Sequence, residues 1–200
     1  MSLSDQPQPV VVLITGPARA GKDTLADGVV SGAKAPVWRI RFADALKEAA
    51  DDFLSALDLY RFGSFSNDGF KAKHRDFLVS SGRFARSLDV DVFARLLCTR
   101  VAFYGSEIAP MSSIRPVVVV PDWRYLNELT AVRTLLGSNG WKVVTVEIQT
   151  AGVLPANDEE AVSLGEIRRS IVTDFSFSFA PGHADCVRKE GINLARELSI

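Results

Sequence analysis

Residues Gly16–Thr24 read G-P-A-R-A-G-K-D-T and directly follow the strand-like run Val10–Thr15. They match the phosphate-binding loop pattern G-x-x-x-x-G-K, and a predicted helix, Lys22–Ala33, follows. The glycines allow a tight turn whose backbone N–H groups point at phosphate oxygens, and the helix adds the positive end of its dipole. Lys22 supplies a positive charge near the β- and γ-phosphates. The stretch therefore predicts a nucleoside triphosphate site.

One position of the loop departs from the usual pattern. The residue after Lys22 is commonly Ser or Thr, which binds Mg²⁺, and here it is Asp23. A carboxylate at this place either holds Mg²⁺ through water or favours the N-terminus of the helix. Thr24 is suited to hydrogen-bond a phosphate. We expect the whole loop to bind ATP: Gly16, Pro17, Ala18, Arg19, Ala20, Gly21, Lys22, Asp23 and Thr24.

The bulk composition is that of one globular domain. The chain has 200 residues, 47% of them hydrophobic and 24% charged, and a net charge of −1. This charge gives no basic field for coating a nucleic-acid polymer. No apolar stretch reaches the length of a membrane span, and the two cysteines favour free thiols in a reducing compartment. We expect a flexible tail at residues 1–9, without a signal peptide, and a cytoplasmic domain at residues 10–200.

Strand-like and helix-like segments alternate along the chain. This alternation gives right-handed crossovers and a parallel sheet, so the sequence predicts a three-layer α/β fold with five parallel strands flanked by helices. The predicted strands are 10–15, 37–42, 117–120 and 141–148, with a short fifth strand at 184–187. The predicted helices are 22–33, 43–57, 71–80, 90–104 and 125–136.

The segment 151–181 has a different character. It contains Gly, Pro and Asn, then a helix-like stretch at 158–172, then the alternating run Phe175–Phe179. Its place after the fourth strand suits an inserted lid, and an ordinary excursion of one helix and one strand explains it equally well. As a lid, it would bring Arg168 and Arg169 over the transferring phosphoryl group.

A second group of candidate residues follows the third predicted strand. Val117–Asp122 reads V-V-V-V-P-D, and phosphate-loop ATPases place a carboxylate near Mg²⁺ at such a strand end. We expect Asp122, like Asp23, to approach the metal through water. Arg124 is suited to bind a phosphate with two parallel hydrogen bonds, and Glu128, one helical turn on, to orient it. A capping Asp122 beside a surface Arg–Glu pair is the simpler explanation of the same residues.

Charged residues gather in two further stretches. The run Phe42–Lys47 reads F-A-D-A-L-K, in which Asp44 suits a helix N-terminus and Lys47 is either solvated surface or part of a second substrate site. The second stretch, 70–87, contains five cations, Lys71, Lys73, Arg75, Arg83 and Arg86. They form either a solvated face or part of a substrate cleft, in which arginines would offset the repulsion between donor and acceptor phosphates.

Four separated motifs occur in a fixed order between Val10 and Ile148. They are G-P-A-R-A-G-K-D-T, F-A-D-A-L-K, K-A-K-H-R-D-F-L-V-S-S-G and D-W-R-Y-L-N-E. Together they resemble the deoxynucleoside monophosphate kinases of bacteriophages, in which the loop typically ends G-K-D-T, the second motif reads F-A-D-x-L-K and the third strand ends in D-x-R-x-x-N-E. That family often has Gln and then Gly-Thr where this chain has Val79–Arg83. A phage origin would imply the host-cell cytoplasm as the location.

The resemblance implies a P-loop kinase fold with a lid insertion. It also implies the activity of a nucleoside monophosphate kinase that uses ATP and Mg²⁺ and accepts a small (deoxy)nucleoside monophosphate. Lys22 and Arg124 are then the catalytic residues. A kinase of another small phosphorylated acceptor, such as phosphomevalonate, and a nucleotide-binding module without turnover remain alternatives. No membrane or nucleic-acid polymer is expected as a partner, and a homodimer is left open. The residues expected around the acceptor are Phe42, Asp44, Lys47, Arg75, Arg86, Arg124 and Glu128.

Overall fold

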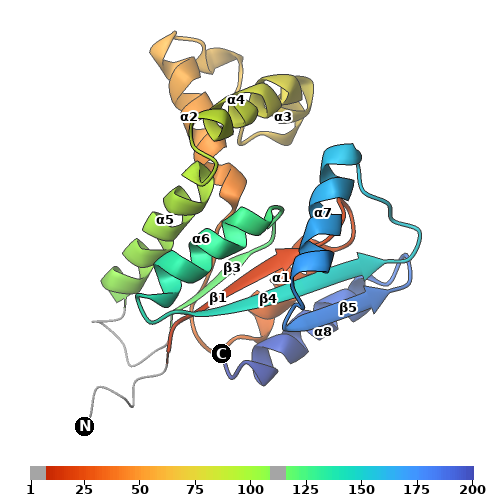
Figure 1. Ribbon diagram of the computed structural model, residues 1–200. Helices are drawn as coiled ribbons and strands as arrows, with labels where there is room; N and C mark the ends of the chain where they lie inside the picture. Colours follow the sequence, from red (N-terminus) through yellow and green to blue (C-terminus); the bar gives the residue numbers. More distant parts are fainter. Residues whose placement is uncertain (1–7, 109–115) are drawn as a thin grey trace.

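Five parallel strands form the central layer of a three-layer α/β fold (Figure 1). The structure is a computed structural model that describes residues 8–108 and 116–200. The strands lie in the order β2-β3-β1-β4-β5, and every neighbouring pair is parallel. This confirms the fold class predicted from the sequence. The strands are β1 (Val10–Thr15), β2 (Val37–Arg39), β3 (Val117–Val120), β4 (Lys142–Thr150) and β5 (Phe175–Phe179).

Helices cover both faces of this sheet. The pair α1 and α8 packs on one face, and α5 and α6 pack on the other, while α3 and α4 stand beyond the sheet (Figure 1). In chain order the helices are α1 (Lys22–Gly32), α2 (Phe42–Ala56), the 3-10 helix η2 (Tyr60–Phe62), α3 (Asp68–Lys73), α4 (Arg75–Leu88), α5 (Val92–Ile108), α6 (Leu126–Gly137), α7 (Asp158–Ser170) and α8 (Ala184–Glu197).

The sheet divides the hydrophobic core in two, because successive side chains of a strand point to opposite faces. Val10, Val12 and Ile14 of β1 belong to the core beneath α1 and α8. Val11 and Leu13 belong to the core beneath α5 and α6. All five are fully buried, as expected for a parallel strand covered on both faces. The central strand is therefore a rigid support for the loop that follows it.

Helices α1 and α8 approach each other closely at two glycines. A Cβ atom added at Gly28 would lie 2.2 Å from the carbonyl oxygen of Arg188. One added at Gly191 would lie 2.3 Å from the carbonyl oxygen of Leu25. A side chain at either position therefore pushes the two backbones apart. Because the phosphate loop leads directly into α1, this crossing also fixes where the loop ends.

We expect Gly191→Ala to lower the free energy of unfolding by about 1–3 kcal/mol, because its methyl group overpacks a contact between two backbones. Gly137→Ala is the matched control, since no atom lies within 4 Å of a Cβ added there. Alanine favours a helix over glycine by up to about 1 kcal/mol, so the control should be neutral or stabilising. Urea unfolding measures both. Wild-type stability of Gly191→Ala would contradict the close crossing.

The fifth strand is the element that the sequence analysis placed wrongly. Residues 184–187 begin α8, and β5 is Phe175–Phe179, which pairs with β4 at the edge of the sheet. Its phenylalanines are half-buried against the α1 and α8 core and its serines are exposed, the alternation of a strand with one covered face. One strand of the predicted lid, β5, therefore belongs to the sheet, while the loop and α7 before it lie outside the sheet.

The remaining differences concern boundaries. β2 is shorter than predicted, because Phe42 is already the first residue of α2. The predicted helix 71–80 is divided at His74 between α3 and α4. Residues 1–7 of the predicted tail lie outside the described residues, whereas the Pro9 carbonyl accepts a hydrogen bond from the Lys142 N–H at 2.8 Å. Within 8–108 and 116–200, every helix is too short or too polar to cross a membrane.

Candidate active site

The phosphate loop leaves the carboxyl end of β1, which lies between β3 and β4. Ligands of open parallel sheets bind at this edge, where the strand order changes direction. Gly16 starts the loop with φ +145°, and a Cβ there would lie 2.2 Å from the Ile148 carbonyl oxygen. Only glycine therefore fits where the loop passes β4. The loop lies between a strand and a helix, as its sequence predicts.

Lys22 lies at the first turn of α1, with its ammonium folded over the loop. Nζ donates hydrogen bonds to the carbonyl oxygens of Gly16 and Pro17, both at 2.7 Å. Burial lowers the pKa of Lys22, and the nearby Glu160 carboxylate opposes this shift. The positive charge is therefore held at the loop, where a phosphate would lie.

The Asp23 carboxylate contacts two arginines, one at the end of β2 and one just after it. Arg41 donates to its Oδ1 at 2.6 Å, and Arg39 donates to the same oxygen. Burial raises the pKa of Asp23, but the hydrogen bond from Arg41 and the charges of both arginines lower it overall. Much of the negative charge that was expected to attract Mg²⁺ is thus neutralised by guanidinium groups.

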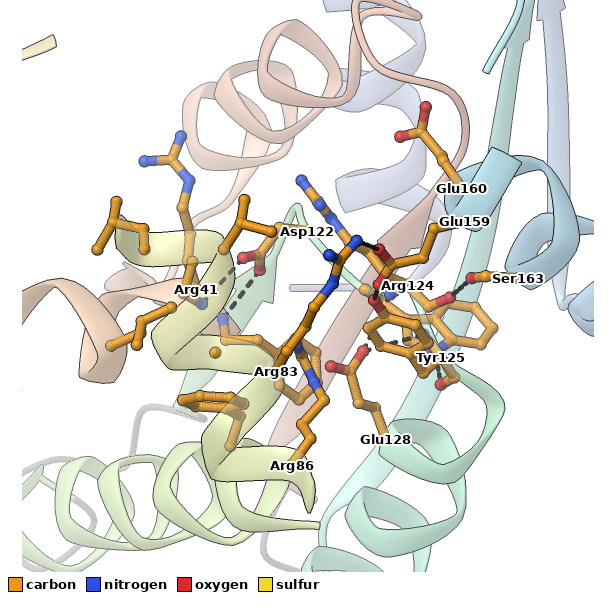
Figure 2. Close-up of a pocket in the computed structure, with 18 of the residues that line it drawn as sticks. Arg41, Arg83, Arg86, Asp122, Arg124, Tyr125, Glu128, Glu159, Glu160 and Ser163 are labelled. Atoms are coloured by element: carbon orange, nitrogen blue, oxygen red, sulfur yellow. Dashed lines mark hydrogen bonds and ion pairs between the residues drawn. The ribbon is translucent and has the colours of Figure 1, made fainter. Parts of the chain in front are cut away.

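Asp122 follows β3 and binds the start of α2 (Figure 2). Its Oδ1 accepts the N–H of Phe42 at 2.9 Å, and its Oδ2 accepts the N–H of Ala43 at 3.1 Å. These N–H groups belong to the first turn of α2 and have no partner within the helix. Burial raises the pKa of Asp122, and the two hydrogen bonds oppose the shift. Each oxygen keeps a lone pair, so this carboxylate fits a contact with metal-bound water.

Glu128 is buried and holds the backbone that carries Arg124. Its Oε2 accepts the N–H groups of Arg124 at 3.0 Å and of Tyr125 at 3.1 Å. This carboxylate also forms the capping box of α6. Burial raises the pKa of Glu128 to about 7, against the effect of these two hydrogen bonds. Glu128 therefore orients Arg124 through its backbone.

We expect the free energy of unfolding to fall between pH 4.5 and about 7 because of Glu128. Its folded-state pKa of about 7 exceeds the ordinary 4.5, so the folded protein keeps a proton that the unfolded chain has released. The stabilisation is fully present below pH 4.5 and is lost as the pH rises through 7. Glu128→Gln keeps the acceptor and removes the titration, so its stability should vary less with pH. Urea unfolding across this range tests the prediction, and parallel curves would contradict it.

A pocket of about 480 Å³ lies beside the loop, between α4, α7 and the segment after β3 (Figure 2). This is the size of a small-molecule site. Of the loop, Gly16 lines it. Asp44 lies outside the lining, and its carboxylate accepts the Arg41 N–H at 2.8 Å and contacts Lys47 Nζ at 3.1 Å. The other residues predicted around the acceptor all line the pocket: Phe42, Lys47, Arg75, Arg86, Arg124 and Glu128.

Arginines give the pocket its charge. Arg86 is held between two aromatic rings, with its guanidinium carbon 4.8 Å from the ring centres of both Phe93 and Tyr125. Such stacking fixes a guanidinium group while leaving its N–H groups free to bind an anion. The arginines that line the pocket are Arg41, Arg75, Arg83, Arg86 and Arg124.

The acids of α7 belong to the site although no sequence motif indicated them. Glu159 accepts hydrogen bonds from Arg83 and Tyr125, and Glu160 accepts one from the Ala18 N–H of the phosphate loop. The nearby Ser163 hydroxyl donates to the Arg124 carbonyl. An Asn followed by three acids indicates a helix N-terminus. No local pattern indicates that this helix end lies against a loop 142 residues away.

The two arginines proposed for the lid lie away from the pocket lining. Arg168 Nε donates to the Glu147 carboxylate of β4 at 2.6 Å. Arg169 is exposed on α7. In this arrangement α7 presents acids, not arginines, to the pocket.

The segment 122–128 also contacts the end of the stretch 42–91, which begins with α2 and runs through α4. Asn127 Nδ2 donates to the Val90 carbonyl at 3.0 Å and to Asp91 Oδ1 at 2.9 Å. Both acceptors lie between α4 and α5. Together with the bonds of Asp122 to the start of α2, these contacts tie both ends of residues 42–91 to one segment.

Comparisons with known proteins find similar folds. No protein-family model matches the chain, and no curated protein matches it. A mutant APS kinase from Mycobacterium tuberculosis is 15% identical, with a TM-score of 0.49, over 95% of this chain and 99% of that one. A gluconokinase from Sinorhizobium meliloti 1021 is 15% identical, with a TM-score of 0.43, over 97% of each chain. A sugar kinase from Janibacter sp. HTCC2649 is 12% identical, with a TM-score of 0.45, over 94% of each.

Proposed function

We propose that the protein transfers the γ-phosphoryl group of ATP to a nucleoside monophosphate or deoxynucleoside monophosphate. The observation that carries this proposal is the joining of a phosphate loop to a pocket lined by arginines (Figure 2). A protein that only binds ATP has no need of a second cationic site, whereas a phosphorylated acceptor does. Leu46, Val79 and Phe93 add an apolar lining that suits a base. The resemblance of the four motifs favours this acceptor class.

The reaction needs little covalent chemistry from the protein. An oxygen of the acceptor phosphate forms a bond to the γ-phosphorus as the bond from that phosphorus to the β–γ bridging oxygen breaks. The acceptor is already an anion, so the protein has to position it, neutralise charge and exclude water. Lys22 supplies charge at the loop, Arg124 binds the acceptor phosphate, and Glu128 fixes the backbone of Arg124.

Mg²⁺ accompanies ATP in such chemistry and, when bound, neutralises part of the charge on its phosphates. We assign Asp122 to a contact with metal-bound water, because each of its oxygens keeps a lone pair. We do not assign Asp23, whose carboxylate already contacts Arg39 and Arg41.

A coupled assay of ADP release, run across the common ribonucleoside and deoxyribonucleoside monophosphates, tests the proposal. We expect at least one of them to stimulate ADP release well above the rate without acceptor. Phosphomevalonate serves as the competing acceptor, and stimulation by it alone would assign the protein to another class of kinase. ATP binding without acceptor-dependent turnover would instead indicate a nucleotide-binding module.

A further inference from the structure

Two neighbouring carboxylates in the first turn of α7 contact two different parts of the site. Glu160 contacts the phosphate loop, and Glu159 contacts the arginine side (Figure 2). Both sides are places where, under the proposed function, a substrate phosphate would bind.

Glu160 offers the phosphate loop an anion. Its Oε1 accepts the N–H of Ala18 at 3.1 Å, and its Oε2 accepts the N–H of Ala156 at 2.6 Å. The charge of Glu160 also acts on the nearby Lys22 ammonium, whose pKa it raises against the effect of burial. A backbone N–H of the loop and the loop lysine are the groups that bind phosphate oxygens in such loops. The carboxylate therefore occupies a loop N–H that a nucleotide needs, and its charge lies near the loop lysine.

Glu159 does the same on the acceptor side. Its Oε2 accepts from Arg83 Nη2 at 3.1 Å, and its Oε1 accepts from the Tyr125 hydroxyl at 2.5 Å. Tyr125 in turn stacks on Arg86. The pKa of Glu159 is lowered by these hydrogen bonds from Tyr125 and Arg83, so the group is a carboxylate near neutral pH. An arginine that a phosphorylated acceptor could use is therefore occupied.

The rest of α7 is anchored separately. Leu164 and Ile167 are buried, and the Ser163 hydroxyl bonds to the Arg124 carbonyl. The chain before the helix, 151–157, is mostly exposed. The first turn of α7 can thus separate from the pocket while the second half of the helix stays in the core.

We propose that the first turn of α7 is a strap whose two carboxylates stand in for the substrate phosphates in the empty protein and leave when substrates bind. This inference rests on the proposed function for the nature of the ligands. Because both ligands compete with one strap, either one releases it for the other, and their binding is positively coupled. The strap also covers the phosphate loop until a nucleotide displaces it.

A purely structural role for these acids makes the opposite prediction. Exposed ion pairs contribute little to stability, and their loss leaves nucleotide affinity unchanged or weaker. If the strap competes with ATP, a mutation that weakens the strap must instead increase the affinity for nucleotide. The sign of the change in affinity therefore separates the two roles.

The test is calorimetric titration of the full chain with the non-hydrolysable ATP analogue AMPPNP and Mg²⁺. Glu160→Gln removes the charge and leaves an acceptor oxygen for only one of the two N–H groups, and we expect it to bind AMPPNP about tenfold more tightly than the wild type. Glu159→Gln, which does not touch the loop, should tighten binding by a smaller factor, about threefold. Glu166→Gln, exposed on the same helix, is the matched control and should bind like the wild type. Unchanged or weaker binding by Glu160→Gln would overturn the strap.

Tyr125→Phe provides a second route that leaves α7 itself unaltered. It keeps the ring that stacks on Arg86 and removes one bond to Glu159, so AMPPNP should again bind more tightly. Wild-type affinity in both this variant and Glu159→Gln would overturn the link between the two sides. The AMPPNP titration needs no acceptor. If the variants bind AMPPNP more tightly as predicted but no acceptor stimulates turnover, the proposed function alone is refuted. If an acceptor stimulates turnover but the variants bind AMPPNP like the wild type, the strap alone is refuted.

Discussion

Lys22→Ala should reduce phosphoryl transfer about 10²–10³-fold, the usual loss when one fixed charge is removed from a developing transition-state charge. Its ammonium contacts the carbonyl oxygens of Gly16 and Pro17, and the side chain is not part of either hydrophobic core. We therefore expect thermal unfolding close to that of the wild type. Turnover and unfolding should be measured on the same preparation.

The control for this variant is Lys189→Ala, which removes an exposed lysine from α8. It should retain both stability and turnover. Near-normal turnover of a folded Lys22→Ala protein would remove the phosphate loop from the chemistry and, with it, the proposed donor site.

Arg124→Ala should lower kcat/KM for the acceptor about 10–100-fold, because hydrogen bonds between charged groups are among the stronger ones. The Arg124 side chain is exposed, while its backbone is held by Glu128 and Ser163, so the fold should survive the change. Arg124→Lys should lose less, since lysine keeps the charge but not the planar pair of donors.

Two measurements assign Arg124 to one side of the reaction. Steady-state kinetics with a varied monophosphate should show the loss, and AMPPNP affinity without acceptor should stay near the wild-type value. A loss of AMPPNP affinity with unchanged acceptor kinetics would place Arg124 on the donor side.

The parts of the fold that follow from local pattern were predictable from the sequence. The apolar runs Val10–Thr15 and Val117–Val120 are β1 and β3 with the predicted bounds. The edge strand Phe175–Phe179 was misplaced because one of its faces is exposed, and its alternating serines differ from the buried strands used as a guide. The short run at 184–187 resembled a strand but begins a helix, a choice that such a short apolar run leaves open.

In the site, the sequence predicted the residues that belong to motifs and missed those that depend on tertiary contact. Arg86 and Arg124 lie in or near recognisable motifs, and both line the pocket. Glu160 meets the loop only because β4 lies beside β1 and α7 follows β4. The pairing of Asp23 with Arg39 likewise requires β2 and α1 to be placed by the sheet. No local spacing contains this information.

The segment 122–128 has a mechanical consequence beyond chemistry. It bonds to the start of α2 through Asp122 and to the α4–α5 junction through Asn127, so residues 42–91 are attached to the sheet at two neighbouring points. A body attached in this way is hindered from sliding along the sheet, and the ion pair between Glu48 of α2 and Arg100 of α5 fixes its base further. Arg124 lies in the segment that carries both attachments. An acceptor phosphate bound there would therefore keep its place relative to the phosphate loop.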